Sequence, residues 1–351
     1  MTHFADLVGH GGVLELLNSE LVAPAQAYLF VGPSNVGKAS VARRFAAALV
    51  GGEDTEAVRR AKSGSHPDLV LVAPEGRASI TVDQARAVVS AAVRTPLEAD
   101  RRVFLFEEAS MLNVEAAHAL LKSIEEPIAS TTFVLVAESE DDLPPTVASR
   151  CRTIVFGRVP EADIAAGLVE LGVEADSASE AARISGGRPG LAVALAREPR
   201  VVSFRDAWLS IPERLTDHPG DAYHIAGDVM SATEPLLEAV KQRQGAEVER
   251  DFPDGPIPKP VSERQDRELA RASDALYVTG LELLASFYRD TAAAQLGAQV
   301  QNTDVPVASL TRVTTETAVQ NAYRVLDAID SLQANQRPQL ALAALFLDLV
   351  P

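Results

Sequence analysis

The stretch Gly32-Pro33-Ser34-Asn35-Val36-Gly37-Lys38-Ala39 decides the fold of this chain. It has the spacing of a phosphate-binding loop, G-x-x-x-x-G-K, in which glycines let backbone N–H groups wrap around a phosphate. A short apolar segment at 27–31 precedes it, and an Ala-rich segment at 39–50 follows. This order of strand, loop and helix predicts the start of an α/β P-loop domain.

The loop keeps one part of a nucleotide site and lacks another. Lys38 would supply a point charge to a phosphate, but the next residue is Ala39, where working sites carry a Ser or Thr hydroxyl for Mg²⁺. Ser40 comes one residue late, so its side chain points about 100° around the helix and is a poor substitute. The candidate residues of this degenerate nucleotide site, which could hold ATP or ADP but requires neither, are Val8, Gly9, Gly32, Asn35, Gly37, Lys38, Ala39 and Ser40.

Two further segments depart from the pattern of ATP hydrolysis. Glu107 and Glu108 follow the apolar segment 102–106, where a P-loop ATPase has Asp-Glu. Glu107 is one methylene longer than the Asp that orients Mg²⁺, whereas Glu108 is placed as a general base and is interpreted as a vestige of one. Alternatively, both are solvated carboxylates at a strand end. Glu138, after the segment 132–136, replaces the Thr or Asn that would position water, and its charge would repel a γ-phosphate.

Strand-like and helix-like segments alternate in the first half of the chain, which indicates a parallel sheet covered by helices. The expected strands are 27–31, 68–72, 102–106 and 132–136, and the expected helices include 39–50, 82–93, 114–124, 161–172, 177–184 and 338–350. A turn-rich segment spans 185–190, and a Pro-rich break at 251–260 interrupts an otherwise helical second half. We predict an α/β P-loop domain (1–158), a small helical lid (159–200) and an all-α collar domain (201–351).

Charge and cysteine content exclude several classes of protein. The net charge of −17 argues against a general DNA-coating role. The single cysteine, Cys151, excludes a disulfide within the chain and a zinc site made of cysteines. Neither a signal peptide nor an apolar run of membrane-spanning length is visible. The expected location is therefore the cytoplasm, and no membrane partner is expected.

Several motifs together resemble the clamp-loader branch of the AAA+ proteins. They lie at 6–10, 32–39, 64–68, 116–127 and 143–151. The most specific are the string A-x-A-L-L-K-x-x-E-E-P and the string S-R-C at this separation. The resemblance is strong over residues 1–195 and weaker beyond, where 280–290 and 337–342 are similar to the collar of actinobacterial delta-prime subunits of DNA polymerase III.

The resemblance implies roles for individual residues. Arg150 of the S-R-C string corresponds to an arginine finger that acts in trans on a neighbouring subunit's ATP, although it could simply be a surface arginine. Gly190 stands where motor subunits carry an arginine that senses ATP, and Arg188 is displaced from that position. Relatives often bind zinc through four cysteines near 51–62, but none is present here, so no metal is expected and His66 is interpreted as a structural turn residue.

The function implied is that of a non-motor, or stator, subunit of a bacterial clamp loader, which helps load the sliding clamp onto primed DNA and has little or no ATPase activity of its own. Its partners would be the motor (gamma/tau) and delta subunits, with the clamp and DNA contacted through the complex at the replisome. The alternatives are a catalytically active clamp-loader ATPase and a scaffold outside replication. Basic residues that could face DNA, or could equally be solvated, are Arg86, Arg94, Arg101 and Arg102.

Overall fold

The computed structural model describes residues 3–4, 7–33, 35–74, 79–126, 128–216, 218–251, 259–302, 305–333 and 337–349. The chain divides into two compact units. The first comprises Met1–Gly167, Gly187–Gly190 and Ala246–Gln265, and the second Leu168–Gly186, Leu191–Gly245 and Asp266–Pro351. Most of the predicted Pro-rich break (252–258) lies outside the described residues, as do Asp6, Ser34 and Pro127 of the quoted motifs.

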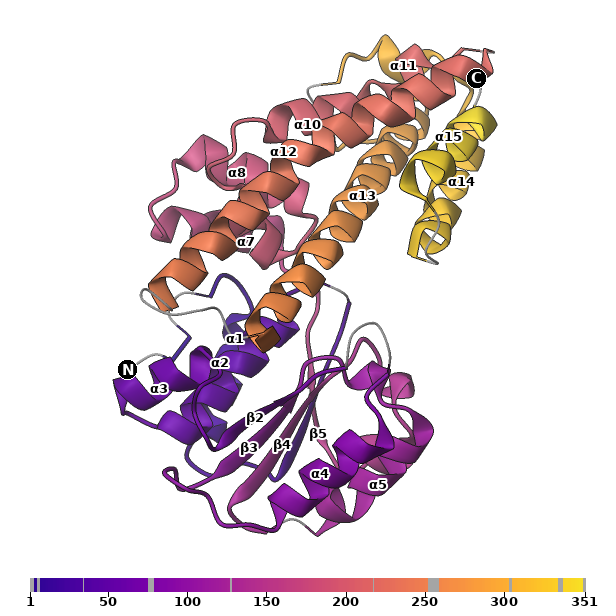
Figure 1. Cartoon of the computed structure of the whole chain (residues 1–351). Helices are drawn as coiled ribbons and strands as arrows, with labels where there is room; N and C mark the ends of the chain where they lie inside the picture. The colour runs from indigo at the N-terminus through magenta and orange to yellow at the C-terminus, as the bar shows by residue number, and fades with distance from the viewer. Residues whose placement is uncertain are drawn as a thin grey trace. The chain divides into compact units, whose positions relative to one another are not determined.

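The first unit is built on a five-stranded parallel sheet in the order β2-β3-β4-β1-β5 (Figure 1). Its strands are β1 (Ala27–Val31), β2 (Leu69–Val72), β3 (Arg102–Phe106), β4 (Thr131–Val136) and β5 (Arg152–Val155). The four predicted strands are confirmed to within one residue. The fifth has no apolar run to reveal it, because only Ile154 of this edge strand is buried.

Helices cover both faces of this sheet. The bounds are α1 (Gly11–Glu20), α2 (Lys38–Gly51), α3 (Thr55–Lys62), α4 (Val82–Ala92), α5 (Val114–Glu125), α6 (Pro145–Ala148) and α7 (Glu161–Glu170). Alternate residues of β1 enter two separate cores: Leu29 packs with residues of α4 and α5, whereas Phe30 packs with residues of α1 and α2. Strands buried on both faces account for the nearly continuous apolar runs from which the sheet was predicted.

The second unit is helical, as predicted. The helices that follow α7 are α8 (Ala175–Ser185), α9 (Pro189–Leu195), α10 (Val201–Leu209), α11 (Ile211–Arg214), α12 (Pro219–Asp251), α13 (Lys259–Gln295), α14 (Thr315–Gln333) and α15 (Pro338–Asp348). Trp208 of α10 is fully buried, and its ring lies 6.4 Å from that of Phe346 on α15. A Cβ atom on Gly280 of α13 would lie 2.0 Å from the Trp208 ring, so the absence of a side chain there allows the three helices to meet.

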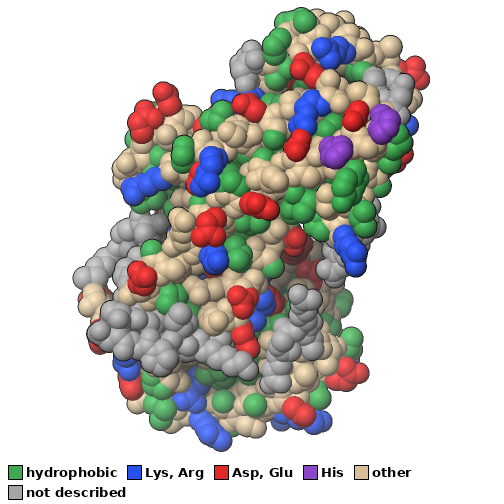
Figure 2. All heavy atoms as spheres, turned by 45° about the horizontal axis from the view of Figure 1, so that its top comes forward, with side chains coloured by type: hydrophobic (Ala, Val, Ile, Leu, Met, Phe, Trp, Pro, Cys, Tyr) green, Lys and Arg blue, Asp and Glu red, His purple; other side chains and the backbone are tan. Residues whose placement is uncertain are grey.

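The net negative charge is not gathered into one field on the face drawn in Figure 2, where acidic and basic side chains are interspersed. Among the described helices, none is long and apolar enough to cross a membrane. The predicted limits of the P-loop, lid and collar domains stay a prediction, because the two compact units follow a different kind of division.

Candidate functional site

The phosphate loop is present and is held by the sheet. Three of its residues have positive φ angles: Gly32 (144°), Asn35 (64°) and Gly37 (104°). The backbone N–H of Gly32 donates to the carbonyl of Glu138 after β4, at 3.0 Å. A Cβ atom on Gly32 would lie 2.0 Å from the carbonyl oxygen of Phe156, just after β5. The first glycine of the motif is therefore required by the packing of the protein backbone, whether or not a phosphate binds.

Lys38 points back into the loop. Its side chain is buried, and its Nζ donates to the carbonyl oxygens of Gly32 and Pro33, each at 2.6 Å. Hydrogen bonds from a charged donor are among the stronger ones in proteins. A phosphate at this loop would thus have to compete with two backbone carbonyls for the ammonium group.

Glu107 is engaged by an arginine that the sequence reasoning did not single out. Nε of Arg43 on α2 lies 2.6 Å from Oε1 of Glu107, and the glutamate is buried. The two side chains attract each other as opposite charges, but their atoms are not aligned for a hydrogen bond. Interpreting Glu107 as a solvated carboxylate is therefore wrong, because a buried carboxylate needs a partner and Arg43 supplies one. Arg43 lies one helical turn after Ala39, on the same face of α2, and this spacing was visible in the sequence.

The Mg²⁺ ion that accompanies ATP in P-loop proteins does not fit this donor set. Ala39 offers no hydroxyl, and the carboxylate of Glu107 is already neutralised by Arg43. Glu108 is half-buried at the start of the turn after β3, and the side chain of Glu138 is exposed. Mg²⁺ requires near-octahedral oxygen coordination and is usually held by one or two carboxylates with phosphate oxygens and water, and here the carboxylate at the usual Asp position is already paired.

The segment before the loop is anchored to it by His10, another residue that was missed. His10 has a positive φ of 60°, and its Nε2 lies 2.8 Å from the carbonyl oxygen of Val36 in the loop. Val8 is buried, and a Cβ atom on Gly9 would lie 2.7 Å from a methyl group of Val159. The structure thus ties His10 to the loop, whereas the roles of Val8 and Gly9 in a nucleotide site stay a prediction.

His66 is a structural residue, as predicted. Its Nδ1 accepts a hydrogen bond from the backbone N–H of Asp68 at 3.1 Å, and its side chain is buried. Asp68 in turn accepts from the backbone N–H groups of residues 97–99 and pairs with Arg102 at 3.0 Å. Although burial alone would raise the pKa of Asp68, these amides and Arg102 outweigh it and lower the pKa to about 2.

Arg102 is therefore wrong as a candidate for facing DNA, since it is buried against Asp68. Two of the other three have protein partners. Arg101 donates to the carbonyl of Ala129, and Arg86 pairs with Asp83 at 3.2 Å. Arg94 is exposed. Whether any of these three faces DNA stays a prediction.

The region where relatives carry zinc ligands forms the helix α3 instead. Asp54 caps it by accepting from the backbone N–H groups of Glu56 and Ala57, and Ala57 and Ala61 are buried on its inner face. Helix packing therefore organises this segment, as predicted.

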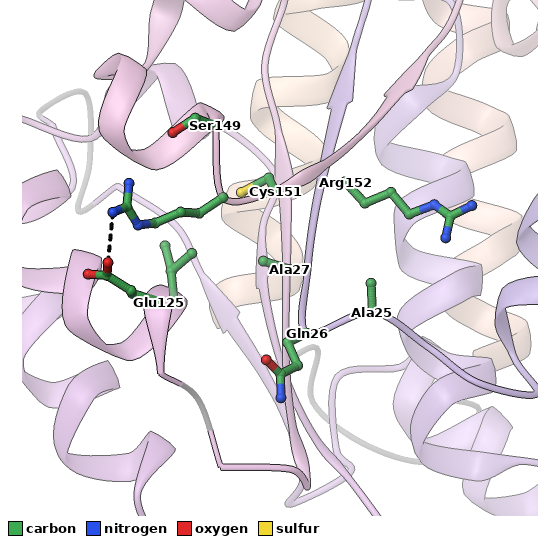
Figure 3. A pocket seen from close by; sticks show the side chains of 9 residues that line it. Ala25, Gln26, Ala27, Glu125, Ser149, Cys151 and Arg152 are labelled. Atoms are coloured by element: carbon green, nitrogen blue, oxygen red, sulfur yellow. Dashed lines mark hydrogen bonds and ion pairs between the residues drawn. The ribbon is translucent and has the colours of Figure 1, made fainter.

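Arg150 lies at the surface, between α6 and β5, beside a pocket shown in Figure 3. Nη1 donates to the carbonyl of Thr146 at 2.9 Å, and Nη2 donates to Oε1 of Glu125 at 2.7 Å. Its side chain is 36% exposed. The pocket is lined by Ala25, Gln26, Ala27, Ile124, Glu125, Ser149, Arg150, Cys151 and Arg152.

Cys151 has the opposite character to its neighbour Arg150. Its thiol is half-buried and lies 3.4 Å from the carbonyl oxygen of Val147. Burial raises the pKa of the Cys151 thiol to about 12, so the thiolate is scarce at neutral pH. Cys151 is thus a packing residue beneath an exposed arginine.

Gly190 stands at the position where the resemblance places an ATP-sensing arginine in motor subunits. Gly190 lies in the first turn of α9 and is exposed, whereas Arg188 is buried just before that helix. Positive φ angles at Gly186 (56°) and Gly187 (79°) confirm the predicted turn.

The chain is similar in sequence to proteins of DNA replication. The model of the family described as "DNA polymerase III, delta subunit" matches residues 13–160. The DNA polymerase III subunit delta' of Pseudomonas aeruginosa is 38% identical over 136 residues, which cover 36% of this chain and 42% of that protein. The corresponding protein of Bacillus subtilis is 32% identical over 211 residues, which cover 58% of this chain and 64% of that protein.

Among solved structures, a gamma subunit-related DNA polymerase III protein from Thermotoga maritima aligns over 96% of this chain and 98% of that chain, with 16% identity and a TM-score of 0.40. The relationship rests on the sequence matches rather than on this distant structural likeness. These matches span less than two thirds of the length of the two delta' relatives. Over its N-terminal part, the chain is similar to the delta subunit family of DNA polymerase III and to the delta' subunits of two bacteria.

Proposed function

We propose that this chain is a stator subunit of a bacterial clamp loader. In this proposal it hydrolyses no ATP itself and presents Arg150 to the ATP of a neighbouring motor subunit. Arginine suits that task because it is always charged and offers several donors in a plane to the charge that develops on the γ-phosphate.

The observation that carries the proposal is the contrast between two sets of charged groups in one α/β unit. Lys38 and Glu107 are buried and bound to partners within the chain. Arg150 is held at the surface, beside an open pocket. The cation and the buried carboxylate of the chain's own loop are therefore engaged within the chain, whereas Arg150 is accessible to a neighbour.

An apolar stripe on α14 supports the assignment of the C-terminal helices as a collar that contacts other subunits. Val319, Tyr323 and Leu326 repeat at helical spacing and are exposed, Tyr323 by 66%. Exposed apolar rows of this kind are typical of surfaces that pack against another helix. The proposed partners are the gamma/tau and delta subunits, and the clamp and primed DNA would be reached through the complex, in the cytoplasm.

The test is a reconstituted clamp loader in which Arg150→Ala replaces the natural chain. We expect the complex to assemble and its clamp- and DNA-stimulated ATPase to fall by roughly threefold or more, because one finger is missing while the other sites keep theirs. Arg59→Ala, which removes an exposed arginine elsewhere in the same unit, is the matched control. Unchanged ATPase in the Arg150→Ala complex would refute the finger role.

The active-ATPase alternative predicts hydrolysis by the isolated chain, and the buried pairing of Glu107 argues against it. A scaffold outside replication predicts no co-purification with motor subunits. Neither alternative is favoured by a contact in the structure.

A further inference from the structure

Arg150 is connected to a second motif of the chain through one side chain. Glu125 is the last residue of α5, in the string that runs from 116 to 127, and its Oε1 accepts a hydrogen bond from Nη2 of Arg150 at 2.7 Å. The two residues are 25 positions apart in the sequence. Figure 3 labels Glu125 and marks this contact with a dashed line.

We propose that Glu125 is a positioning residue for Arg150, one that holds the guanidinium in the orientation in which it meets a neighbour's nucleotide. This inference rests on the proposed function of Arg150 as a finger acting in trans. Glu125 does not touch the nucleotide in this proposal, and it acts only through the arginine.

The hydrogen bonds of Arg150 fix the plane of its guanidinium. A guanidinium has five N–H donors. One is directed to the carbonyl of Thr146 and one to Glu125, from its two terminal nitrogens. Contacts at both terminal nitrogens restrain rotation of the group, and three N–H donors remain for a ligand. A donor set that is oriented before the reaction needs no reorganisation when the charge develops.

Glu125 is itself well placed to hold a fixed position. The residue before it, Ile124, is buried in the sheet core, as are Leu120 and Ala117 on the same helix. The helix thus carries a rigid inner face up to the residue that contacts Arg150. A site supported by side chains on regular elements is more exact than one that depends on a loop alone.

The pair contributes little to the stability of the fold. The side chain of Glu125 is 52% exposed and that of Arg150 is 36% exposed. Ion pairs of this exposure are screened by solvent and have small effects on folding. Loss of the pair should therefore leave the protein folded, and a functional effect of its loss would reflect orientation.

The test is a double-mutant cycle in the reconstituted clamp loader, with Glu125→Ala, Arg150→Ala and the double variant. We expect Glu125→Ala to lower the kcat of clamp-stimulated ATP hydrolysis by about twofold to threefold, with little change in the KM for ATP. The double variant should be no slower than Arg150→Ala alone, because the glutamate acts through the arginine. Glu125→Gln keeps an acceptor oxygen and should restore part of the lost rate.

Glu126→Gln is the matched control, since it removes the charge of the next, exposed residue. Three outcomes would overturn the inference: no change in Glu125→Ala, a rise in its rate, or a loss in the double variant that multiplies the two single losses. If Arg150→Ala itself had no effect, the proposed function would fail instead. An unchanged thermal unfolding midpoint in each variant confirms that the fold is intact.

Discussion

The phosphate loop and the Arg150 edge belong to the same α/β unit, but their charged groups are used in opposite ways. In the loop, Lys38 binds backbone carbonyls and Glu107 binds Arg43, and all of these contacts are buried or partly so. At the edge, Arg150 is exposed, and its guanidinium donates to the carbonyl of Thr146 and to Glu125. The difference indicates that a nucleotide motif can be kept for its packing, whereas the residue proposed to serve another subunit stays on the surface.

The largest effect, on the free energy of unfolding, is expected from Gly32→Ala. This substitution tests whether the packing of the protein backbone holds the loop in place. The new methyl group would meet the carbonyl oxygen of Phe156 at 2.0 Å, on a residue with a φ of 144°. Backbone strain and overpacking together should lower the free energy of unfolding by about 3 kcal/mol or more. Urea denaturation measures this change.

Gly37→Ala is the control for Gly32→Ala. It also changes a glycine with positive φ, but a Cβ atom there meets no other atom within 4 Å. Equal destabilisation by the two substitutions would show that backbone strain alone, rather than the contact with Phe156, makes Gly32 necessary.

The second prediction concerns how the alkylation rate of the Cys151 thiol depends on pH. It tests whether the segment around Arg150 is rigid. Because burial raises the pKa of this thiol to about 12, iodoacetamide should alkylate the folded chain at least about a hundredfold more slowly than the urea-unfolded chain at pH 8. The alkylation rate of the folded chain should still be rising at about pH 10. The alkylation rate of the unfolded chain should level off once the pH passes the ordinary thiol pKa. Fast alkylation with a plateau near pH 9 would mean that the edge opens readily.

The third prediction tests whether the Glu107–Arg43 pair keeps metal out of the loop. Restoring the hydroxyl alone with Ala39→Thr should leave Mn²⁺ binding in the presence of ADP weak, because Glu107 still pairs with Arg43. Adding Glu107→Asp shortens the side chain and draws the carboxylate away from Arg43, so Mn²⁺ affinity should rise by about tenfold, the size expected when a neighbouring opposite charge acts more weakly on a carboxylate. Electron paramagnetic resonance of free Mn²⁺ measures it.

Ala39→Thr combined with Glu108→Asp is the matched control for that experiment, since it shortens the neighbouring carboxylate instead. If Ala39→Thr alone bound Mn²⁺ as tightly as the double variant, the pair would have no part in excluding metal.

The smallest effect is expected from Lys38→Met, which removes the one intact charge of the loop. Because Lys38 is bound to the carbonyls of Gly32 and Pro33, the ATPase and clamp-loading rates of the reconstituted complex should stay within about twofold of the natural complex. A large loss would show that a nucleotide uses this lysine after all, and the contrast between loop and edge would weaken.

Much of the fold and part of the site could be predicted from the sequence. The strands β1 and β3 were predicted to the residue, because β1 and residues 103–106 of β3 form short apolar runs with polar or turn residues on either side. Strand β5 was not, because edge strands carry polar side chains and only tertiary pairing reveals them. Arg150 was found through its motif, whereas its contact with Glu125 depends on two segments that meet only in the folded chain.

The interpretation of Glu107 shows the same limit. Its length identified it as a departure from the usual Asp, but the sequence could not show that Arg43 on another element would bind it. Arg102 was grouped with surface arginines, because nothing local distinguishes an arginine at the start of a strand from an exposed one. Arg102 is buried because Asp68, the residue just before β2, pairs with it in the folded chain.

The internal contacts of Lys38 have a mechanical consequence. While Lys38 stays bound to the carbonyls of Gly32 and Pro33, the charge of the loop is balanced from within the chain. If no nucleotide displaces these contacts, the subunit would keep one shape from one turnover of its neighbours to the next. If it works within a ring of motors, it can serve as the fixed point against which their strokes are directed.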